Sequence, residues 1–361
     1  MKRNKILIIV TDLQLGGIQN YVRALAALLS EMHFNVFIIA INDAQNQGSE
    51  NIISLKKLKS FQKPLYIRRF LKENEIDLIL DHRTKSNFIK WKIYDFLFRK
   101  TPKVQFIHSA NLKLYFYNNK YFNQLMYQNT QLFVSVSKYI EQLVGQKTDT
   151  KLEVGYYFFQ KNEKLIDNTG SLKKDILFVG RFDDAAKDLN FLLHAYLHSE
   201  LYLQNIRFIF LGAGKDQLLI ENFAKENNLE NHIKICAPVK DTSPYYHRAK
   251  TVVLASRFEG FPLILLEALY HKTPVVTTEF NASVYEIIQP DYNGIVTEKN
   301  IPAFSDALKK IYNDAVFYEQ LLLNVQTPLS ATFSKDNAKL VWEKIISDLL
   351  KNRTSETGSN Q

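Results

Sequence analysis

TVVLASRFEGFPLILLEALYHKTPVVTT, residues 251–278 of this 361-residue chain, is the stretch that decides the fold. Its hydrophobic pattern predicts a buried strand over 252–255, a loop over 256–261, a short apolar helix that opens at Pro262, and a second buried strand over 274–278. Two buried strands joined through a helix are the repeating unit of a parallel sheet. The sequence therefore predicts an α/β fold.

The start of this short helix is predicted to bind an anion or a sugar oxygen. Proline suits the first helical turn, because its missing N–H would have no intrahelical partner there. Backbone N–H groups near it would point out of the helix start, where the helix dipole favours negative charge. These groups belong to Gly260, Phe261 and Leu263.

Two carboxylates flank this predicted cradle. Glu259 lies in the loop before it, and Glu267 lies between one and two turns into the helix. Carboxylates accept hydrogen bonds from sugar hydroxyls, although such a pair by itself also fits two solvated charges at a helix end. The whole run S-R-F-E-G-F-P-L-I-L-L-E-A-L followed by T-P-V-V is more specific. In this run the sequence resembles the retaining GT-B glycosyltransferases of the group 1 type, family 4.

The resemblance implies two Rossmann-like domains that face each other across a cleft. It also implies transfer of a sugar, with retention of configuration, from a nucleotide-sugar such as a UDP-sugar to a hydroxyl of a glycan or lipid-linked acceptor in surface-polysaccharide synthesis (lipopolysaccharide or capsule). Glu259 would face the donor sugar and Glu267 would hold the ribose hydroxyls. No cofactor or metal is expected, and the sequence contains no D-x-D motif for a nucleotide-bound cation.

The first forty residues predict a βαβ unit, with strands over 6–10 and 36–41 and a helix over 18–30. Gly16 and Gly17 lie where the loop becomes the helix, and glycine there lets a ligand approach the backbone at a positive helix end. A glycine turn that only changes the chain direction is the alternative. In the resembling family this pair lines the donor pyrophosphate.

His108 directly follows the predicted strand 104–107. A polar residue at the carboxyl end of a parallel strand faces the ligand crevice of open α/β folds. The alternative is a structural histidine with its hydrogen bonds satisfied. In the resembling family a histidine at this place lies against the donor sugar, so His108 is predicted as catalytic.

The second half opens with a predicted strand over 175–179, followed by Gly180, Arg181 and Lys187. Two cations at a helix start can bind a diphosphate and stabilise its charge as it leaves. Asp188 is predicted to cap the next helix. The family pattern Gly-Arg…Lys-Gly matches here, except that Asp188 replaces the second glycine.

Two further features are predicted for this half. The loop A-P-V-K-D-T, with Pro238 and Val239, follows a strand over 233–236, and the resembling family places its nucleotide base there. Ser283 and Glu286 have the spacing of a capping box for another helix.

The domain prediction follows these signals. A polar linker is expected within 145–171. The predicted parts are an acceptor domain over 1–160, a donor domain over 171–330, an amphipathic helix over 331–350 that crosses back to the first domain, and a disordered tail over 351–361.

The basic residues are distributed unevenly along the chain. Residues 1–164 contain 25 Lys and Arg against 13 Asp and Glu, and the remainder contains 21 against 24. Such a surface suits nucleic acid, anionic lipid or an anionic acceptor, but no nucleic-acid-binding motif accompanies it. The segment 90–100 and the Tyr- and Phe-rich stretch after it could lie on an anionic membrane, or could be surface helices with one face in their own core.

The compartment is predicted from cysteine content and hydropathy. One cysteine, Cys236, excludes a disulfide framework, and no segment is long and apolar enough to span a bilayer. A cytoplasmic protein is expected, either free in the cytosol or bound peripherally to the inner face of the cell membrane. Two alternatives to the glycosyltransferase function are a catalytically inactive GT-B scaffold and a nucleic-acid-binding protein that binds through its positive charge.

Overall fold

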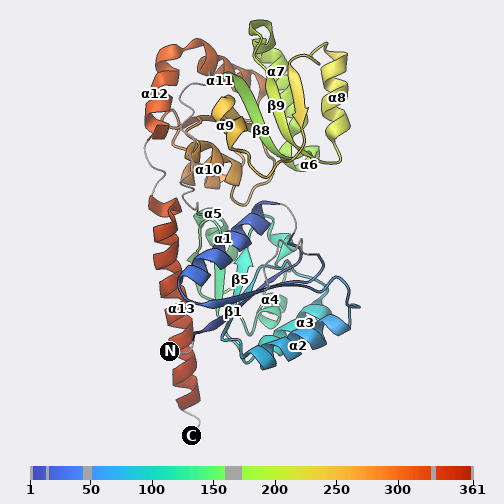
Figure 1. Cartoon of the computed structure of the whole chain (residues 1–361), viewed down its shortest axis with the longest axis vertical. Coiled ribbons are helices and arrows are strands. Elements are labelled where there is room, and N and C mark those ends of the chain that lie inside the picture. The colour runs from blue at the N-terminus through green and yellow to red at the C-terminus, as the bar shows by residue number, and fades with distance from the viewer. Residues whose placement is uncertain (1–2, 14–15, 44–50, 159–172, 327–330, 359–361) are drawn as a thin grey trace. The chain divides into compact units, whose positions relative to one another are not determined.

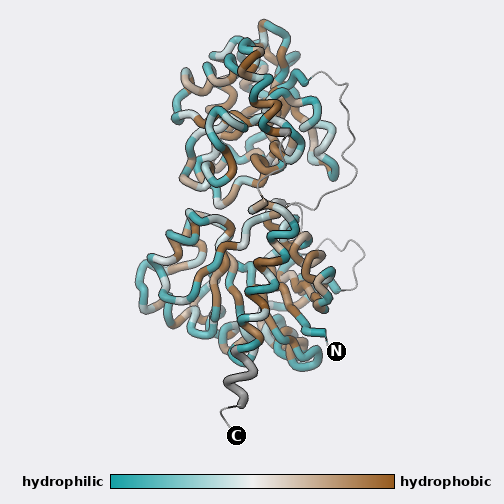
Figure 2. The backbone as a smooth tube through the Cα atoms, turned by 90° about the vertical axis from the view of Figure 1, so that its left-hand side faces the viewer, coloured by the Kyte–Doolittle hydropathy of each residue, from teal (hydrophilic) through white to brown (hydrophobic). Residues whose placement is uncertain are grey.

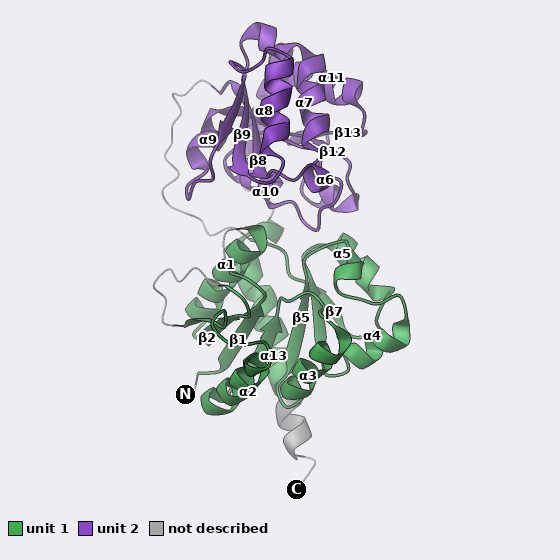
Figure 3. Cartoon of the chain, turned by 90° about the vertical axis from the view of Figure 1, so that its right-hand side faces the viewer, with its two compact units in different colours: residues 1–161, 331–361 green, residues 162–330 purple. Residues whose placement is uncertain are grey.

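The computed structural model describes residues 3–13, 16–43, 51–158, 173–326 and 331–358. The chain forms two compact units (Figure 3). Unit 1 contains residues 1–161 and 331–361, and unit 2 contains residues 162–330. Each unit is an α/β structure built around one parallel sheet, as the sequence predicts.

Unit 1 has a seven-stranded sheet in the order β3-β2-β1-β4-β5-β6-β7. Its strands are β1 Lys5–Val10, β2 Asn35–Ala40, β3 Ile52–Ser54, β4 Leu78–Asp81, β5 Lys103–Ile107, β6 Leu132–Ser135 and β7 Leu152–Val154. The central strands β1, β4, β5 and β6 are buried along almost their whole length, as expected for a parallel sheet covered on both faces. The strand order reverses between β1 and β4, and in such sheets ligands bind beyond the carboxyl ends at this point.

Helices cover the sheet of unit 1 (Figure 1). They are α1 Gly17–Glu31, α2 Gln62–Asn74, α3 Phe88–Phe98, α4 Lys120–Met126, α5 Lys138–Gly145 and α13 Lys335–Gly358, with 3-10 turns η1 Leu112–Leu114 and η4 Ala331–Phe333. The helix α13 follows unit 2 in the sequence but packs on unit 1, where Trp342 is 1% exposed and its ring lies 5.6 Å from that of Phe106.

Unit 2 has a six-stranded sheet in the order β10-β9-β8-β11-β12-β13. Its strands are β8 Asp175–Arg181, β9 Phe208–Ala213, β10 Ile233–Cys236, β11 Ala249–Leu254, β12 Val275–Thr278 and β13 Gly294–Thr297. Its helices and 3-10 turns are α6 Asp184–Lys187, α7 Leu189–Ser199, η2 Leu201–Gln204, α8 Gln217–Glu226, α9 Ser243–Arg248, α10 Leu263–Tyr270, η3 Ala282–Glu286, α11 Ile301–Asn313 and α12 Ala315–Gln326. Here the strand order reverses between β8 and β11.

Several local predictions were wrong. A strand, β7, lies inside the predicted linker, of which residues 159–171 lie outside the described residues. The turn η3 has no Ser283–Glu286 capping box, because Asn281 is the cap and accepts from the Ser283 amide. The predicted tail is helical through Gly358, the last residue of α13, and residues 359–361 are not described.

Hydropathy follows this architecture, because hydrophobic residues concentrate along the central strands of each unit (Figure 2). Among the described residues, no helix is both long and apolar enough to cross a bilayer.

Candidate functional site

Two of the predicted donor residues of unit 2, Lys187 and Glu259, meet at the point where the strand order of its sheet reverses. The strands β8 and β11 are paired neighbours, so the loops that follow their carboxyl ends lie side by side. The segment after β8 contains the short helix α6, which ends at Lys187, and the loop after β11 carries Glu259. The fold thus brings together two side chains that are 72 residues apart in the sequence.

Lys187 and Glu259 form an ion pair with 2.5 Å between Nζ and Oε1. The same carboxylate oxygen accepts a hydrogen bond of 2.6 Å from Ser256 Oγ, and the backbone carbonyl of Glu259 accepts one of 3.0 Å from Asn281 Nδ2. The side chains of Lys187 and Glu259 are 22% and 12% exposed, so both still reach the surface. A cation and a carboxylate held in this way can bind a phosphate and a sugar hydroxyl next to each other.

Arg181 is the last residue of β8, and its side chain is 71% exposed. Its Nη2 atom lies 3.4 Å from Asp183 Oδ2, and Lys215 Nζ lies 3.4 Å from the other oxygen of that carboxylate. The guanidinium is therefore open to a solvent-borne anion. Gly180, which precedes it, lies so close to β9 that a Cβ atom at Gly212 would be 1.9 Å from the Gly180 carbonyl oxygen.

The helix α10 begins at Leu263, so Pro262 is its N-cap in an extended conformation and not its first helical residue. Gly260, Phe261 and Pro262 are buried and Leu263 is half-buried, which places this segment inside the packed loop after β11.

Glu267 lies further along α10 and accepts a hydrogen bond of 2.6 Å from Tyr246 Oη on α9. Burial raises the pKa of the Glu267 carboxyl, and the Tyr246 hydrogen bond offsets part of that rise. Pro238 and Val239 are exposed in the loop after β10. Neither has a hydrogen bond to the Lys187–Glu259 pair among the contacts of the described residues.

Asp188 does not cap α7. It has φ 52° and ψ 54°, the left-handed conformation, and its side chain makes no capping hydrogen bond. The carboxylate is instead paired with two cations, at 2.6 Å from Arg257 Nη2 and 2.8 Å from Lys299 Nζ.

His108 of unit 1 is 6% exposed and lies in a hydrogen-bonded row of three side chains. Its Nε2 atom is 2.8 Å from His82 Nδ1, and its Nδ1 atom is 3.0 Å from Tyr157 Oη. Burial lowers the pKa of His108 to about 3, and burial followed by repulsion from His108 lowers the pKa of His82 well below 6.5. Both rings are therefore neutral at pH 7, and one of the two facing nitrogens donates its proton to the other.

This arrangement limits what His108 can do. Both of its ring nitrogens already have partners inside unit 1, so either nitrogen would reach a sugar only by releasing His82 or Tyr157. The catalytic role of His108 stays a prediction. Beyond the carboxyl end of β1, at the same edge of the sheet, Gly16 is the N-cap of α1 and Gly17 its first residue. The two residues before them lie outside the described part of the chain.

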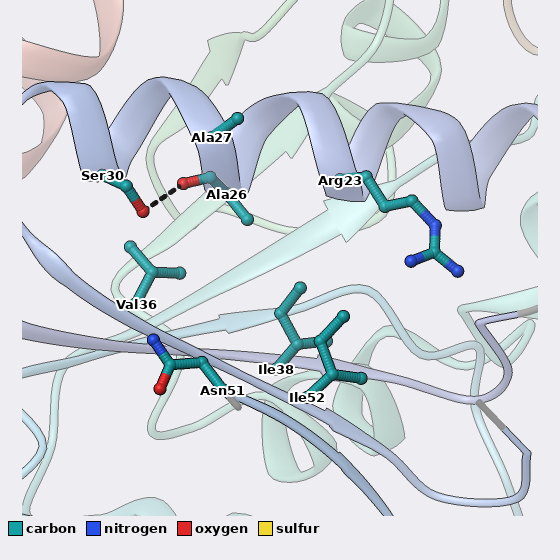
Figure 4. Close-up of a pocket in the computed structure, with 8 residues that line it drawn as sticks. All are labelled: Arg23, Ala26, Ala27, Ser30, Val36, Ile38, Asn51 and Ile52. Carbon is teal, nitrogen blue, oxygen red and sulfur yellow. Dashed lines mark hydrogen bonds between the residues drawn. The ribbon is translucent and has the colours of Figure 1, made fainter. Parts of the chain in front are cut away.

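A cavity of about 320 Å³ lies elsewhere in unit 1, between α1 and the strands β2 and β3 (Figure 4). It is lined by residues such as Arg23, Ala26, Val36 and Ile52, and none of the predicted site residues contributes to it.

Two family models match this sequence. The family described as "Glycosyltransferase Family 4" matches residues 15–154, and the family described as "Glycosyl transferases group 1" matches residues 173–314. The chain belongs to the group 1 and family 4 glycosyltransferases. It is thus a glycosyltransferase, and the matched segments fall in unit 1 and unit 2 respectively.

Relatives agree with this assignment. The glycosyltransferase is 24% identical, over 96% of its own length and 99% of the relative's, to an alpha-1,4-N-acetyl-D-galactosaminyltransferase of Campylobacter jejuni named for an undecaprenol diphosphate-linked GalNAc glycan. A second Campylobacter jejuni enzyme, named as an N-acetylgalactosamine-N,N'-diacetylbacillosaminyl-diphospho-undecaprenol 4-alpha-N-acetylgalactosaminyltransferase, is 31% identical over 42% of this chain and 41% of its own length.

The fold matches solved glycosyltransferases of the GT-B type. The pneumococcal O-GlcNAc transferase in complex with UDP and GlcNAc superimposes with a TM-score of 0.78 at 13% identity, covering 97% of this chain and 100% of that chain. At this identity the likeness concerns the fold alone.

Sequence reasoning missed His82, Tyr157 and Tyr246 in this glycosyltransferase. His82 had a usable signal, because it directly follows a predicted strand just as His108 does, and parallel strands end at one edge. Tyr157 and Tyr246 gave no local signal, since their partners are 49 and 21 residues away in the sequence.

Within the described ranges, no three His, Cys, Asp or Glu side chains are placed so that they could hold a metal ion. That the reaction needs no metal stays a prediction.

Proposed function

We propose that this glycosyltransferase moves a sugar from a UDP-sugar to a hydroxyl of a lipid-linked glycan during surface-polysaccharide synthesis. The observation that carries the proposal is the Lys187–Glu259 ion pair, which lies where the strand order of unit 2 reverses. Arg181, beside Asp183, is open to solvent. The names of the Campylobacter relatives supply the acceptor class, and the UDP in the pneumococcal structure supports the nucleotide.

In this proposal the donor diphosphate binds Arg181 and Lys187, and the ribose hydroxyls bind Glu267. The cations stabilise the negative charge that develops on the diphosphate as its bond to the sugar breaks. Glu259 orients the sugar through its hydroxyls and keeps Lys187 in place. Because Glu267 is a half-buried carboxylate already oriented by Tyr246, it needs little reorganisation when ribose binds.

Retention is proposed for a chemical reason. The common UDP-hexoses are α-linked at the diphosphate, and both Campylobacter relatives are named as α-transferases. An α product from an α donor requires attack from the face that the diphosphate leaves. The acceptor hydroxyl can then give its proton to the departing phosphate, so that no covalent enzyme intermediate is needed.

The test is thermal stabilisation by UDP-, GDP-, ADP- and TDP-sugars, each without and with Mg²⁺. A ligand that binds only the folded protein raises the melting temperature by mass action. We expect one UDP-sugar to give the largest shift, with or without the metal. If no nucleotide-sugar shifts the melting temperature, the proposal is wrong; a shift only with Mg²⁺ would refute the metal-free part.

We also propose that unit 1 contacts an anionic membrane through a patch formed by α3 and α4. One face of α3 is buried through Trp91, Tyr94 and Phe98, as a surface helix requires. Its other face exposes an apolar stripe, and α4 exposes aromatic rings beside it: Ile89, Ile93, Phe96, Tyr121 and Phe122. Basic residues lie in or next to these helices, namely Lys90, Arg99, Lys100 and Lys120. A basic, aromatic helix surface of this kind binds at the interface of anionic bilayers.

Flotation with liposomes tests the patch. The protein should float with phosphatidylglycerol vesicles and not with phosphatidylcholine vesicles, because the lysines need anionic lipid. Replacing Ile93 and Phe96 with Ser should abolish flotation. A matched control replaces Leu218 and Leu323, which are exposed in unit 2 at 66% and 64%, and should float like the unmodified protein. Equal losses in both variants would contradict the patch.

A further inference from the structure

The carboxylate of Asp188 is buried and paired with two cations. Its side chain is 8% exposed and accepts from Arg257 at 2.6 Å and from Lys299 at 2.8 Å. A buried carboxylate with two cationic partners is held firmly, because moving away would leave a buried charge unpaired. Its backbone has φ 52°, a conformation that glycine adopts with less strain. The carboxylate is therefore what this residue supplies and glycine could not.

These contacts join three loops of unit 2. Asp188 follows Lys187 in the loop after β8, and the backbone carbonyl of Ala186 in that loop accepts from the Arg257 amide at 2.8 Å. Arg257 belongs to the loop after β11, which also carries Glu259. Lys299 belongs to the loop after β13, and its Nζ atom also donates to the Ala255 carbonyl at 3.2 Å.

We propose that Asp188 is a positioning residue that, with Arg257 and Lys299, clamps the Lys187 loop to the Glu259 loop. This rests on the proposed function, in which Lys187 binds the donor diphosphate. Lys187 is the last residue of the single-turn helix α6, and the Asp188 amide closes that turn on the Asp184 carbonyl at 2.9 Å. A helix of one turn is not stable by itself. The clamp therefore fixes where the Lys187 side chain leaves the backbone.

The clamp also balances charge. An unpaired carboxylate next to the donor diphosphate would repel it. Asp188 would therefore weaken diphosphate binding, compared with the glycine that the resembling family has at this position, if its charge were not neutralised. Arg257 and Lys299 together carry one positive charge more than Asp188 neutralises. The clamp thus leaves the site attractive to an anion, while it keeps Lys187 available beside Glu259.

Asp188→Gly tests the role of the carboxylate without straining the backbone. Glycine adopts the left-handed conformation easily, so the substitution removes only the ion pairs. The readout is the Kd of UDP, measured by titration calorimetry, with kcat/KM for the donor as a second readout. We expect both to worsen about tenfold, the size of one lost charge-assisted contact. Asp188→Asn should recover part of the loss, since asparagine tolerates the same backbone and still accepts hydrogen bonds.

Lys299→Met tests the clamp from the other side. If the clamp acts as one device, this variant should weaken UDP binding in the same direction, and the double variant with Asp188→Gly should be no weaker than Asp188→Gly alone. Additive losses would mean that Lys299 acts on the ligand directly and would overturn the clamp.

Unit 2 offers a matched control. Asp175 is also a buried carboxylate, 7% exposed, and accepts two hydrogen bonds of 3.0 Å from Arg207 at the opposite edge of the same sheet. Asp175→Asn should lower the melting temperature and leave the Kd of UDP unchanged. The clamp is refuted if Asp188→Gly binds UDP like the unmodified protein, or if Asp175→Asn weakens UDP equally. An unmodified protein that binds no UDP would instead refute the proposed function.

Discussion

At the scale of single residues, Arg181 offers the sharpest test of the donor site. Its side chain is 71% exposed, so its replacement removes the proposed contact with the diphosphate and little packing. Removing one preorganised donor to a developing charge costs about 10²-fold in rate, and we expect Arg181→Ala to lower kcat by that amount. Initial rates with the donor found by thermal stabilisation measure it.

Lys215→Ala is the control for that prediction. Lys215 contacts the same Asp183 carboxylate at the same 3.4 Å and is 67% exposed, but it follows β9. Its loss should change kcat little. If the two variants lose activity equally, the effect belongs to Asp183 and not to the guanidinium of Arg181.

The histidine row of unit 1 predicts acid sensitivity. The folded pKa values of His82 and His108 lie below the unfolded value of about 6.5, so the unfolded chain binds more protons below that pH. Stability is therefore full above pH 6.5 and declines as the pH falls toward the folded pKa of His108, about 3. The slope for each histidine is no more than about 1.4 kcal/mol per pH unit, which is the effect of one proton bound by the unfolded chain and not by the folded protein.

His82→Asn isolates one of these two groups. The asparagine amide offers a donor and an acceptor, and one of them can replace His82 Nδ1 opposite His108, so the hydrogen bond survives while one titrating ring is lost. Urea unfolding at pH 7 and pH 5 should show a smaller stability loss than in the unmodified protein. His198→Asn, on the exposed side of α7, should leave the loss unchanged. An unchanged pH dependence in His82→Asn would contradict the buried neutral pair.

The candidate site could be predicted from sequence only in part. Lys187 and Glu259 could be chosen because each sits in a recognisable loop, and the parallel sheet brings those loops together. The role of Asp188 could not, because its partners Arg257 and Lys299 are distant in sequence and a local rule favoured an N-cap. Hydrogen-bond partners across a fold depend on strand order, which a local pattern does not encode.

At the scale of elements, helices and strands were predicted well wherever apolar residues repeat with a clear helical or strand spacing. The helix expected over 18–30 is α1, Gly17–Glu31, because its apolar residues repeat at helical spacing. The strand β7 was missed because all three of its residues are only half-buried at the edge of the sheet. It has no continuous apolar run to mark it, and pairing with β6 creates it.

The attachment of α3 to the sheet gives an element-scale prediction. Asp95 of α3 is 1% exposed and accepts from Lys103 of β5 at 3.1 Å and from Asn129 at 2.8 Å. Asp95→Ala would leave the buried Lys103 ammonium without this partner, which costs about 3–5 kcal/mol. Urea unfolding should show that loss. The double variant Asp95→Leu with Lys103→Met should regain much of it, because the buried ammonium is removed together with its partner. Lys92, which also pairs with Asp95 at 3.3 Å, is 29% exposed and keeps its hydrogen bond to the Leu125 carbonyl.

The exposed ion pair of Arg69 and Glu73 on α2 is the comparison for that prediction. Glu73→Ala should leave the unfolding curve where it is, since exposed pairs contribute little. If the double variant at Asp95 and Lys103 stays as unstable as Asp95→Ala, lost packing and not an orphaned charge explains the cost.

At the scale of the whole molecule, the last helix joins the two ends of the chain in one unit. Trp342, Ile345 and Ile346 of α13 are buried in unit 1, although the helix follows unit 2 in the sequence. Unit 1 is therefore complete only after the rest of the chain has been made. Trp342→Ala removes a large buried side chain that stacks against Phe106 of β5, and such changes cost about 3–5 kcal/mol.

The loss of stability caused by Trp342→Ala should be confined to unit 1. Amide hydrogen exchange should accelerate in the strands β1, β5 and β6 of unit 1, because their slowest exchange needs the unit to open and opening becomes easier. Exchange in β8 and β11 of unit 2 should keep its unmodified rate, since those strands belong to a separate core. Equal acceleration in both units would show that they unfold as one cooperative structure, and α13 would then stabilise the whole molecule and not unit 1 alone.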